Sequence, residues 1–233
     1  MPLPYTGQNG ELNFEADVVE LLKKARWEHE VLKNKTIPEL IDNWKDILFE
    51  RNRTTLNNVP LSSDEMDRVM DVVRLQANTP VKANHFVNGR PIAIKRDSDS
   101  PDKQHAGHEV YLDLFSATEI AGGSSRYQIA EQTYFSTDPQ FNDRRGDITL
   151  LINGMPVIHI ELKASGVNVY EASNQIVKYA NEGVWSGFMG LVQVFWAMTP
   201  EDALFFANAG NPTAFNSAFF FRWGDRDNNV SKT

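Results

Sequence analysis

The feature that most constrains the fold is a stretch in the middle of the chain, GDITLLINGMPVIHIELK, at residues 146–163. Two short apolar runs in it flank Asn153-Gly154, and both of these residues tolerate the positive φ that a tight primed turn requires. The two runs are therefore predicted to be antiparallel neighbours in a buried sheet. Asp147 at one end of this hairpin must then lie close to Glu161 and Lys163 at the other end.

The register of the hairpin decides how close these charges lie. With a loop of only two residues, Asp147 faces residue 160, and Glu161 projects to the other side of the sheet. A three-residue loop that includes Met155, or a single β-bulge, places Asp147 opposite Glu161 instead. Directly opposed side chains have Cβ atoms about 4.5 to 5.5 Å apart. Glu161 and Lys163 share a face in either case, because they are two residues apart on one strand.

Two carboxylates at that distance raise each other's pKa unless a cation lies between them. A hard divalent ion, Mg²⁺ or Mn²⁺, suits such an oxygen site. It polarises a phosphodiester and lowers the pKa of a bound water, while Lys163 positions that water or stabilises the developing charge. The alternative is that the strands simply end in solvent. Glu161 and Lys163 then form an exposed ion pair that is worth under about 1 kcal/mol.

The whole chain has 233 residues, a length that predicts one α/β domain by default rather than two small ones. Periodicity predicts a helical N-terminal part over 11–78, with Ser62 and Glu65 at capping-box spacing and Pro38 as a first helical residue. The polar segment 95–109 is predicted to be a flexible surface loop, and strand patterns begin only after it. The expected elements are helices at 11–26, 37–52 and from about 62, strands from 110 and 126, the hairpin, a helix at 170–181, and strands at 191–198 and 203–206.

Histidines are the other candidate metal ligands. His105 and His108 lie in the polar loop with no partner at diagnostic spacing, which favours a solvated loop over a zinc site. His159 lies within the hairpin. It is expected to pack, or to meet water, on the face opposite the core, one residue out of phase with the proposed site.

Composition excludes several classes of protein. The chain has no cysteine, which rules out disulfides, thiolate zinc sites and cysteine nucleophiles, and fits a reducing cytoplasm. No apolar stretch approaches the roughly 20 residues of a membrane span, and the N-terminus lacks the pattern of a secretory signal. The net charge of -8 argues against a free-standing, non-specific nucleic-acid binder. If this chain acts on DNA, another part or partner is expected to deliver the duplex.

A longer pattern adds a resemblance to a known family. Asp147, then thirteen residues, then Glu161-Leu162-Lys163, is followed by Gln175 and Tyr179 at Q-x-x-x-Y spacing. This pattern resembles the PD-(D/E)xK nuclease core. The segments RRGDITLLINGMPVIHIELKASG, NQIVKYAN, NFEADVVELLKKARWE and ILFERNR are similar to the N-terminal nuclease domain of HsdR, the restriction subunit of type I restriction-modification enzymes. The likeness covers most of the chain and is strongest over 127–181. Gly146 departs from the motif, which has proline there.

The resemblance implies a restriction-endonuclease-like α/β fold, with a mixed sheet flanked by helices and a nuclease core at 110–223. It implies that Asp147 and Glu161 are metal ligands, that Lys163 is catalytic, and that Glu15 is an extra metal contact. The last of these competes with a simpler interpretation of Glu15 as an acid near a helix N-terminus. Gln175 and Tyr179 share a helix face and by resemblance support cleavage or contact the DNA backbone. The alternative is a surface glutamine and a core tyrosine.

The implied function is Mg²⁺-dependent cleavage of double-stranded DNA, with Mn²⁺ as a possible substitute, in a complex with modification and specificity subunits. ATP would enter only through motor domains, because the chain has no G-x-x-x-x-G-K-[ST] motif. The ATP-dependent translocase domains of the family are therefore expected to be absent from this chain, which is interpreted as a fragment. The alternative function is a non-catalytic docking or DNA-clamping module whose nuclease-like site is degenerate.

Overall fold

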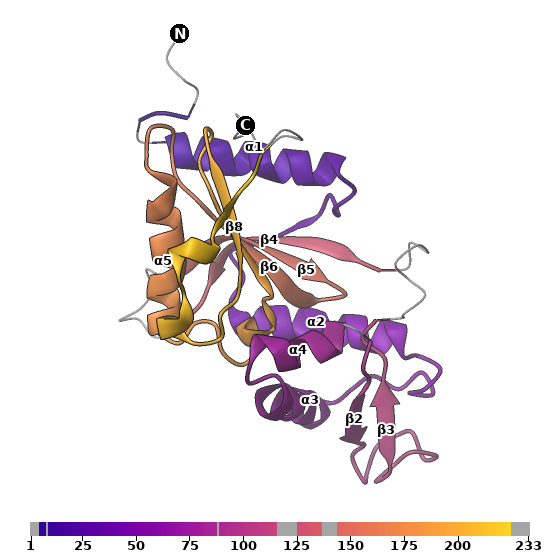
Figure 1. Ribbon diagram of the computed structural model, residues 1–233. Coiled ribbons are helices and arrows are strands. Elements are labelled where there is room, and N and C mark those ends of the chain that lie inside the picture. Colours follow the sequence, from indigo (N-terminus) through magenta and orange to yellow (C-terminus); the bar gives the residue numbers. More distant parts are fainter. Residues whose placement is uncertain (1–4, 8, 88, 116–124, 137–143, 225–233) are drawn as a thin grey trace.

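The computed structural model describes residues 5–7, 9–87, 89–115, 125–136 and 144–224. These residues form a seven-stranded mixed sheet with helices on both faces, and a separate two-stranded sheet (Figure 1). The expected α/β class with a mixed, helix-flanked sheet is confirmed.

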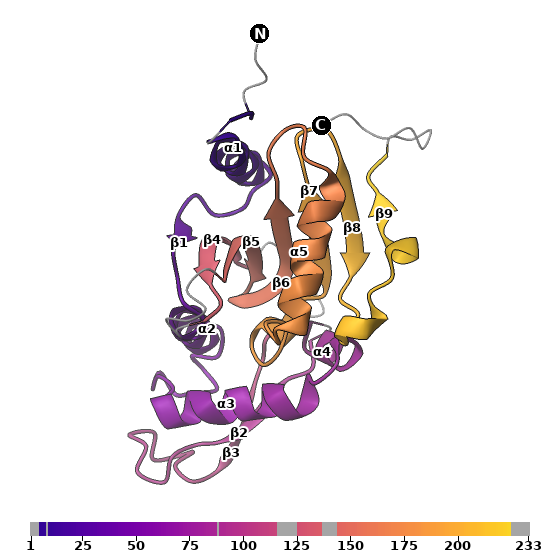
Figure 2. The same cartoon turned by 90° about the vertical axis from the view of Figure 1, so that its left-hand side faces the viewer.

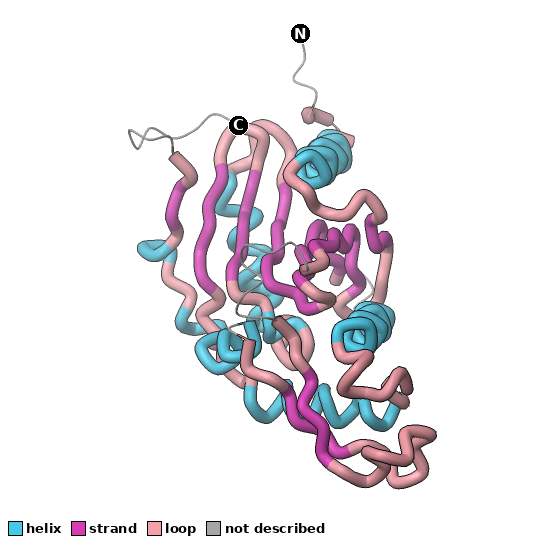
Figure 3. The backbone as a smooth tube through the Cα atoms, turned by 90° about the vertical axis from the view of Figure 1, so that its right-hand side faces the viewer, coloured by secondary structure: helices cyan, strands magenta, loops and turns pink. Residues whose placement is uncertain are grey.

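The large sheet has the strand order β1-β4-β5-β6-β7-β8-β9. Pairs β1–β4 and β6–β7 are parallel, and the other neighbours are antiparallel. A helix, α5, connects β6 to β7, as parallel neighbours require a crossover. Figure 3 shows these strands side by side, with the two-stranded sheet apart from them. The strands are β1 Val31–Lys33, β4 Tyr127–Tyr134, β5 Arg145–Ile152, β6 Met155–Leu162, β7 Val194–Met198, β8 Ala203–Ala207 and β9 Phe221–Arg222.

Two apolar clusters hold the helices against the large sheet. On one face, Ile176 of α5 and Trp44 of α2 belong to a cluster with Phe195 of β7. On the other face, Phe14 of α1 packs in a cluster with Ile160 of β6. Figure 2 shows α5 lying along β6 and β7, with α1 well away from it. The described helices are α1 Gly10–Lys24, α2 Ile37–Arg51, α3 Ser63–Gln76, α4 Pro80–Val87 and α5 Val169–Asn181, with 3-10 turns at Met189–Leu191, Pro212–Ala214 and Ser217–Phe219.

Capping boxes fix where two of these helices begin. The predicted box of Ser62 and Glu65 is confirmed at the start of α3. The first helical residue predicted for α2 was wrong, because Thr36 forms a second capping box with Glu39, which makes Pro38 the second helical residue. No described helix has the length and apolar character needed to cross a bilayer.

The prediction that strands begin only after the polar loop was wrong. β1 precedes it and joins the large sheet, and β2, Ile92–Lys95, pairs with β3, Glu109–Leu112. The strand expected from 110 therefore belongs to the small sheet and not to the main one. β1 is only three residues long, and its pairing with β4 joins segments about a hundred residues apart in the chain. Periodicity within a short window carries no signal for such a strand.

The loop between β2 and β3 makes specific contacts with α3. Arg96 Nε lies 3.0 Å from Glu65 Oε1, and both side chains are 1% exposed. The Asp97 amide donates to the same Glu65 oxygen at 2.8 Å, and the Ser62 hydroxyl donates to Asp97 at 2.6 Å. Further along, Asn57 Nδ2 donates to Asp102 at 2.9 Å. These contacts explain why a segment rich in polar residues contains buried ones.

The hairpin of β5 and β6 combines a tight turn with a bulge. Asn153 and Gly154 have φ of 51° and 82°, as a primed two-residue turn requires. Leu151 pairs with Pro156 beside the turn, but Leu150 pairs with Ile158, so the strand β6 carries one extra residue, at 157. Of the registers considered from the sequence, the single bulge is therefore the correct one.

Candidate functional site

The bulge brings the two predicted metal ligands together. Ile148 pairs with Ile160, so Asp147 and Glu161 occupy the next opposed position of the same two strands. Asp147 Oδ2 accepts a hydrogen bond from the backbone N–H of Leu162 at 2.7 Å. Asp147 is 8% exposed and Glu161 is fully buried. The alternative of an exposed ion pair at the strand end is therefore wrong.

Lys163 lies at the edge of this pair of acids. Its Nζ is 3.9 Å from Glu161 Oε1 and 3.5 Å from Glu11 Oε1, and it donates to the carbonyl of Leu162 at 2.9 Å. Its side chain is 16% exposed, so it is neither fully buried nor free in solvent. Glu11, in the first turn of α1, was not among the predicted site residues.

Burial and mutual repulsion raise the pKa of all three predicted carboxylic acids. Burial raises the pKa of Glu161 to about 8, with smaller contributions from the charges of Glu11 and Glu15 and an opposing one from Lys163. Burial, followed by the charge of Glu161, holds the pKa of Asp147 well above its usual range. The pKa of Glu15 rises to about 7, again mainly through burial, and Asp147 adds to this. One partly exposed lysine therefore does not neutralise the acids of the site.

Glu15, on α1, lies close enough to the site for the charge of Asp147 to raise its pKa. It is 2% exposed and lies beyond the first helical turn, where the acidic residue is Glu11. The simpler interpretation of Glu15 as an acid at the helix N-terminus is therefore wrong. Gln132 Nε2 lies 2.7 and 2.6 Å from the two Glu15 carboxylate oxygens.

Gln132 was missed by the sequence analysis. Its φ of 57° lies in the left-handed region, in the middle of β4 and level with Asp147 of β5. A non-glycine residue there costs on the order of 1 to 3 kcal/mol and commonly marks a functional site. In the sequence Gln132 is an ordinary polar residue of an alternating strand, so no local pattern identifies it.

The two oxygens of Glu161 have different surroundings. Oε2 lies 3.0 Å from His159 Nε2, whereas the buried Oε1 has no hydrogen-bond partner among the described residues. An unpartnered buried carboxylate oxygen next to Asp147 suits a hard cation in its donor chemistry. Within the described part of the chain, however, no three His, Cys, Asp or Glu side chains are grouped closely enough to hold a metal ion. Asp147 and Glu161 would supply two ligands, and water or phosphate the others, as Mg²⁺ sites commonly have.

The placement predicted for His159 was wrong. Residues 159 and 161 are two apart on one strand and so share a face, and His159 contacts Glu161 rather than lying out of phase with it. His159 is fully buried, and burial lowers its pKa to about 3, so the ring is neutral.

Gln175 and Tyr179 lie together on α5 beside the sheet. Gln175 Nε2 donates to the Tyr179 hydroxyl at 2.8 Å, and that hydroxyl donates to the carbonyl of Arg145 at 3.0 Å. Tyr179 is 3% exposed, and burial, then the charge of Glu161, raises its pKa. Tyr179 is thus a core residue, as the simpler interpretation had it, and its hydroxyl also holds the backbone two residues before Asp147.

The close packing around Gly146 explains why this position has glycine and not the proline of the motif. A Cβ atom at this position would lie 2.3 Å from Phe135 Cζ and 2.6 Å from His159 Cε1. Neither proline nor any other side chain fits unless these two rings move.

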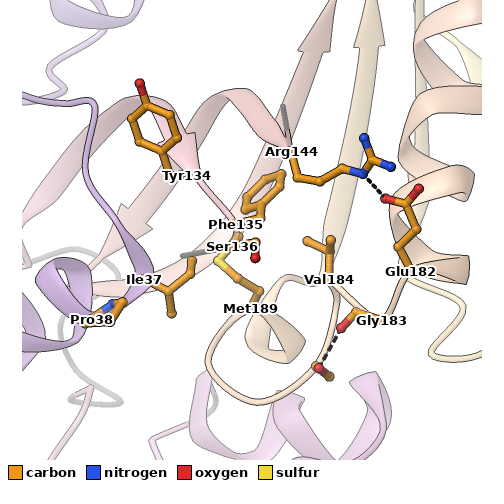
Figure 4. A pocket seen from close by; sticks show the side chains of 11 residues that line it. Ile37, Pro38, Tyr134, Phe135, Ser136, Arg144, Glu182, Gly183, Val184 and Met189 are labelled. Atoms are coloured by element: carbon orange, nitrogen blue, oxygen red, sulfur yellow. Dashed lines mark hydrogen bonds and ion pairs between the residues drawn. The ribbon is translucent and has the colours of Figure 1, made fainter. Parts of the chain in front are cut away.

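A separate hollow lies between α2, the end of β4 and the segment after α5. Its volume is about 420 Å³, and the Arg144–Glu182 ion pair, 2.5 Å long, closes one side (Figure 4). None of Asp147, Glu161 and Lys163 lines it. The acids therefore lie at the end of a hairpin and not in this pocket.

The mixed sheet, with helices on both faces and opposed acids at the end of a central hairpin, is consistent with a restriction-endonuclease-like core. Comparison of the sequence with known families agrees with this class. The chain belongs to the family described as type I restriction enzyme R protein N terminus, whose family model matches residues 11–214.

Curated relatives of this chain carry related names. It is 28% identical, over 96% of its length, to the type I restriction enzyme SsaAORF53P endonuclease subunit of Staphylococcus saprophyticus. It is 25% identical over the same share to the SauMSSORF170P endonuclease subunit of Staphylococcus aureus. A shorter match, 36% identical over 38% of the chain and 29% of the relative, is to the EcoprrI endonuclease subunit of Escherichia coli. The chain spans about 22% of the length of the two staphylococcal relatives.

Proposed function

We propose that this chain is the DNA-cleaving part of a type I restriction enzyme R subunit, and that it hydrolyses phosphodiester bonds of double-stranded DNA with Mg²⁺, or Mn²⁺ in its place. The observation that carries the proposal is the opposition of Asp147 and Glu161 across the bulged hairpin, with Lys163 beside them. Family membership and the endonuclease names of the relatives support the same assignment.

In this proposal Asp147 and Glu161 hold the ion and the other residues act around it. A bound divalent ion would polarise the phosphodiester and lower the pKa of a bound water. Lys163, whose amine lies 3.9 Å from Glu161 Oε1, orients the attacking water or stabilises the charge that develops on the phosphate. Gln175 and Tyr179 hold the backbone that leads into Asp147, through the contact with the Arg145 carbonyl.

The proposal also assigns roles to the rest of the R subunit and to the partner subunits. The chain spans about a fifth of the length of its staphylococcal relatives, so we assign ATP-driven translocation to the remainder of the R subunit. We assign sequence recognition to the modification and specificity subunits of the complex, and we place the complex in the cytoplasm. A net charge of -8 fits this division, because other parts would then attract the duplex.

A second candidate is a non-catalytic docking or DNA-clamping module with a degenerate site. It is favoured by one observation, that no three acidic or histidine side chains of the described residues are grouped as a metal site. A calorimetric titration of the chain with Mn²⁺ distinguishes the two candidate functions. A nuclease gives saturable heat that Asp147→Asn abolishes, whereas a docking module gives no saturable heat.

The decisive experiment uses the full-length R subunit assembled with its partner subunits. We expect Asp147→Asn, Glu161→Gln and Lys163→Ala each to lower the DNA cleavage rate by about 10²-fold or more, because the first two remove a charged ligand of the proposed ion and the third removes the cation beside the reacting phosphate. ATP hydrolysis by the same complexes should be retained. Glu171→Gln, on the exposed first turn of α5, removes a carboxylate by the same chemistry and is the matched control. Undiminished cleavage by the Asp147 or Glu161 variant would refute the proposal.

A further inference from the structure

The unlike surroundings of the two Glu161 oxygens lead to a role for His159. The carboxylate is fully buried, and its Oε2 lies 3.0 Å from His159 Nε2. Among the residues that the structure describes, Oε1 has no hydrogen-bond partner, and the Lys163 amine lies 3.9 Å from it. One oxygen of the carboxylate is therefore held while the other is left for a ligand.

The His159 ring is itself held from several sides. Its Nδ1 lies 3.1 Å from the hydroxyl oxygen of Thr149, which is also fully buried and lies opposite it on β5. The rings of Trp185 and Phe135 pack against it with centroids 4.9 and 5.7 Å away. These contacts fix the ring plane, and so they fix the direction in which Nε2 points.

Hydrogen-bond chemistry then assigns the proton on this ring. An ionised carboxylate only accepts hydrogen bonds, so Nε2 must carry the proton when Glu161 binds a cation. Nδ1 is then an acceptor, and the Thr149 hydroxyl donates to it. Thr149, His159 and Glu161 therefore form one chain of donors that ends at Glu161 Oε2.

We propose that His159 is a positioning residue for Glu161: it holds Oε2 and thereby directs Oε1 towards the metal, while Thr149 fixes the ring that does so. The inference rests on the proposed function, because it assumes that Asp147 and Glu161 bind a divalent cation. A hydrogen-bonded partner behind a metal ligand commonly changes metal affinity or activity by about 10- to 100-fold when it is lost.

The test compares two variants that keep different halves of the imidazole. The amide of His159→Gln can reach the position of Nε2 and donate to Glu161, whereas the shorter amide of His159→Asn occupies the position of Nδ1. In calorimetric titration of the chain with Mn²⁺, we expect His159→Gln to bind close to wild-type affinity and His159→Asn to bind about 10- to 100-fold more weakly. In the assembled enzyme, His159→Asn should need a correspondingly higher Mg²⁺ concentration for half-maximal cleavage. If His159 only filled space in the core, His159→Gln would not be expected to bind Mn²⁺ more tightly than His159→Asn.

A second pair of variants tests the far end of the chain of donors. Thr149→Val keeps the shape of the side chain and removes the hydroxyl, and Thr149→Ser keeps the hydroxyl and removes a methyl group. We expect weaker Mn²⁺ binding for the valine variant only. Equal affinity in His159→Asn and wild type would overturn the role of His159 and leave the metal site standing. Absence of binding in the wild-type chain itself would instead overturn the proposed function, and this inference with it.

¹⁵N NMR of the histidine ring nitrogens in the wild-type protein tests the same proposal, and it does not depend on whether any variant folds. With Mg²⁺ present, we expect the His159 proton on Nε2 and an unprotonated Nδ1. A proton on Nδ1 with Nε2 bare would leave nothing to donate to Glu161 and would overturn the proposal.

Discussion

Glu161→Gln is expected to remove part of the pH dependence of the stability of the metal-free protein. The carboxyl of Glu161 is fully buried, and its pKa rises from the ordinary 4.5 to about 8, mainly through burial. Between these two values the folded state keeps a proton that the unfolded chain has lost. The stability that this group contributes is present below pH 4.5, and it is lost as the pH rises towards 8.

The size of the effect follows from the number of protons. One extra proton bound by the folded state lowers the free energy of unfolding by about 1.4 kcal/mol per pH unit. Between pH 5 and pH 7, Glu161 alone therefore lowers the free energy of unfolding by about 2 to 3 kcal/mol. Glutamine has the same shape and no charge, so Glu161→Gln should lose this much less stability over the same interval.

Urea unfolding with a chelator present, at several pH values between 5 and 8, measures this slope directly. The control is Glu171→Gln, on the exposed first turn of α5, which should follow the wild type at every pH. Added Mg²⁺ should then stabilise the wild type by about 2.7 kcal/mol at a hundred times the dissociation constant, and it should leave the Glu161 variant unchanged. Parallel pH profiles for wild type and Glu161→Gln would refute the reasoning, because Glu161 would then ionise at no cost.

Two further predictions test the packing around the site and the loop after β2. Gly146→Ala places a Cβ atom 2.6 Å from His159 Cε1, so we expect a loss of about 1 to 3 kcal/mol in urea unfolding, together with weaker Mn²⁺ binding; unchanged stability would show that the rings move freely. Arg96→Met leaves Glu65 buried without its cation, so it should cost about 3 to 5 kcal/mol at pH 7. A cost below about 1 kcal/mol, typical of exposed pairs, would contradict this burial.

The parts of the fold that the sequence predicts are those set by local rules. The turn at Asn153-Gly154 needs positive φ at two adjacent positions, and Ser62 and Glu65 have the spacing of a capping box, so both could be found without any tertiary information. The hairpin pattern indicated Asp147, Glu161 and Lys163 as site residues, and the resemblance to the family added Glu15, Gln175 and Tyr179 together with the restriction-endonuclease-like fold. The sequence left three registers of β6 open, and both the choice of the bulge among them and its position, at residue 157, required the structure.

What the sequence analysis missed depends on contacts between distant segments. Gln132 reaches Glu15, which is 117 residues away in the chain, through a backbone conformation that no local pattern signals. β1 is too short to show alternation, and it joins the sheet only through β4. The wrong placement of His159 has a different cause. Its spacing from Glu161 was visible in the sequence, and the two-residue period of a strand already placed both on one face.

The residues of the site do not by themselves balance the negative charge of its buried acids. Asp147, Glu15 and Glu161 all have raised pKa values, and Lys163 opposes this rise at Glu161 without cancelling it. Apolar packing on both faces of the sheet holds the hairpin in place, so the acids cannot separate to relieve their repulsion. The folded protein therefore has two ways to lower this energy, which are to keep protons or to bind a cation. Near neutral pH these two would compete, and a divalent ion that displaced the protons would gain both the charge of the acids and the Glu161 oxygen that has no hydrogen-bond partner among the described residues.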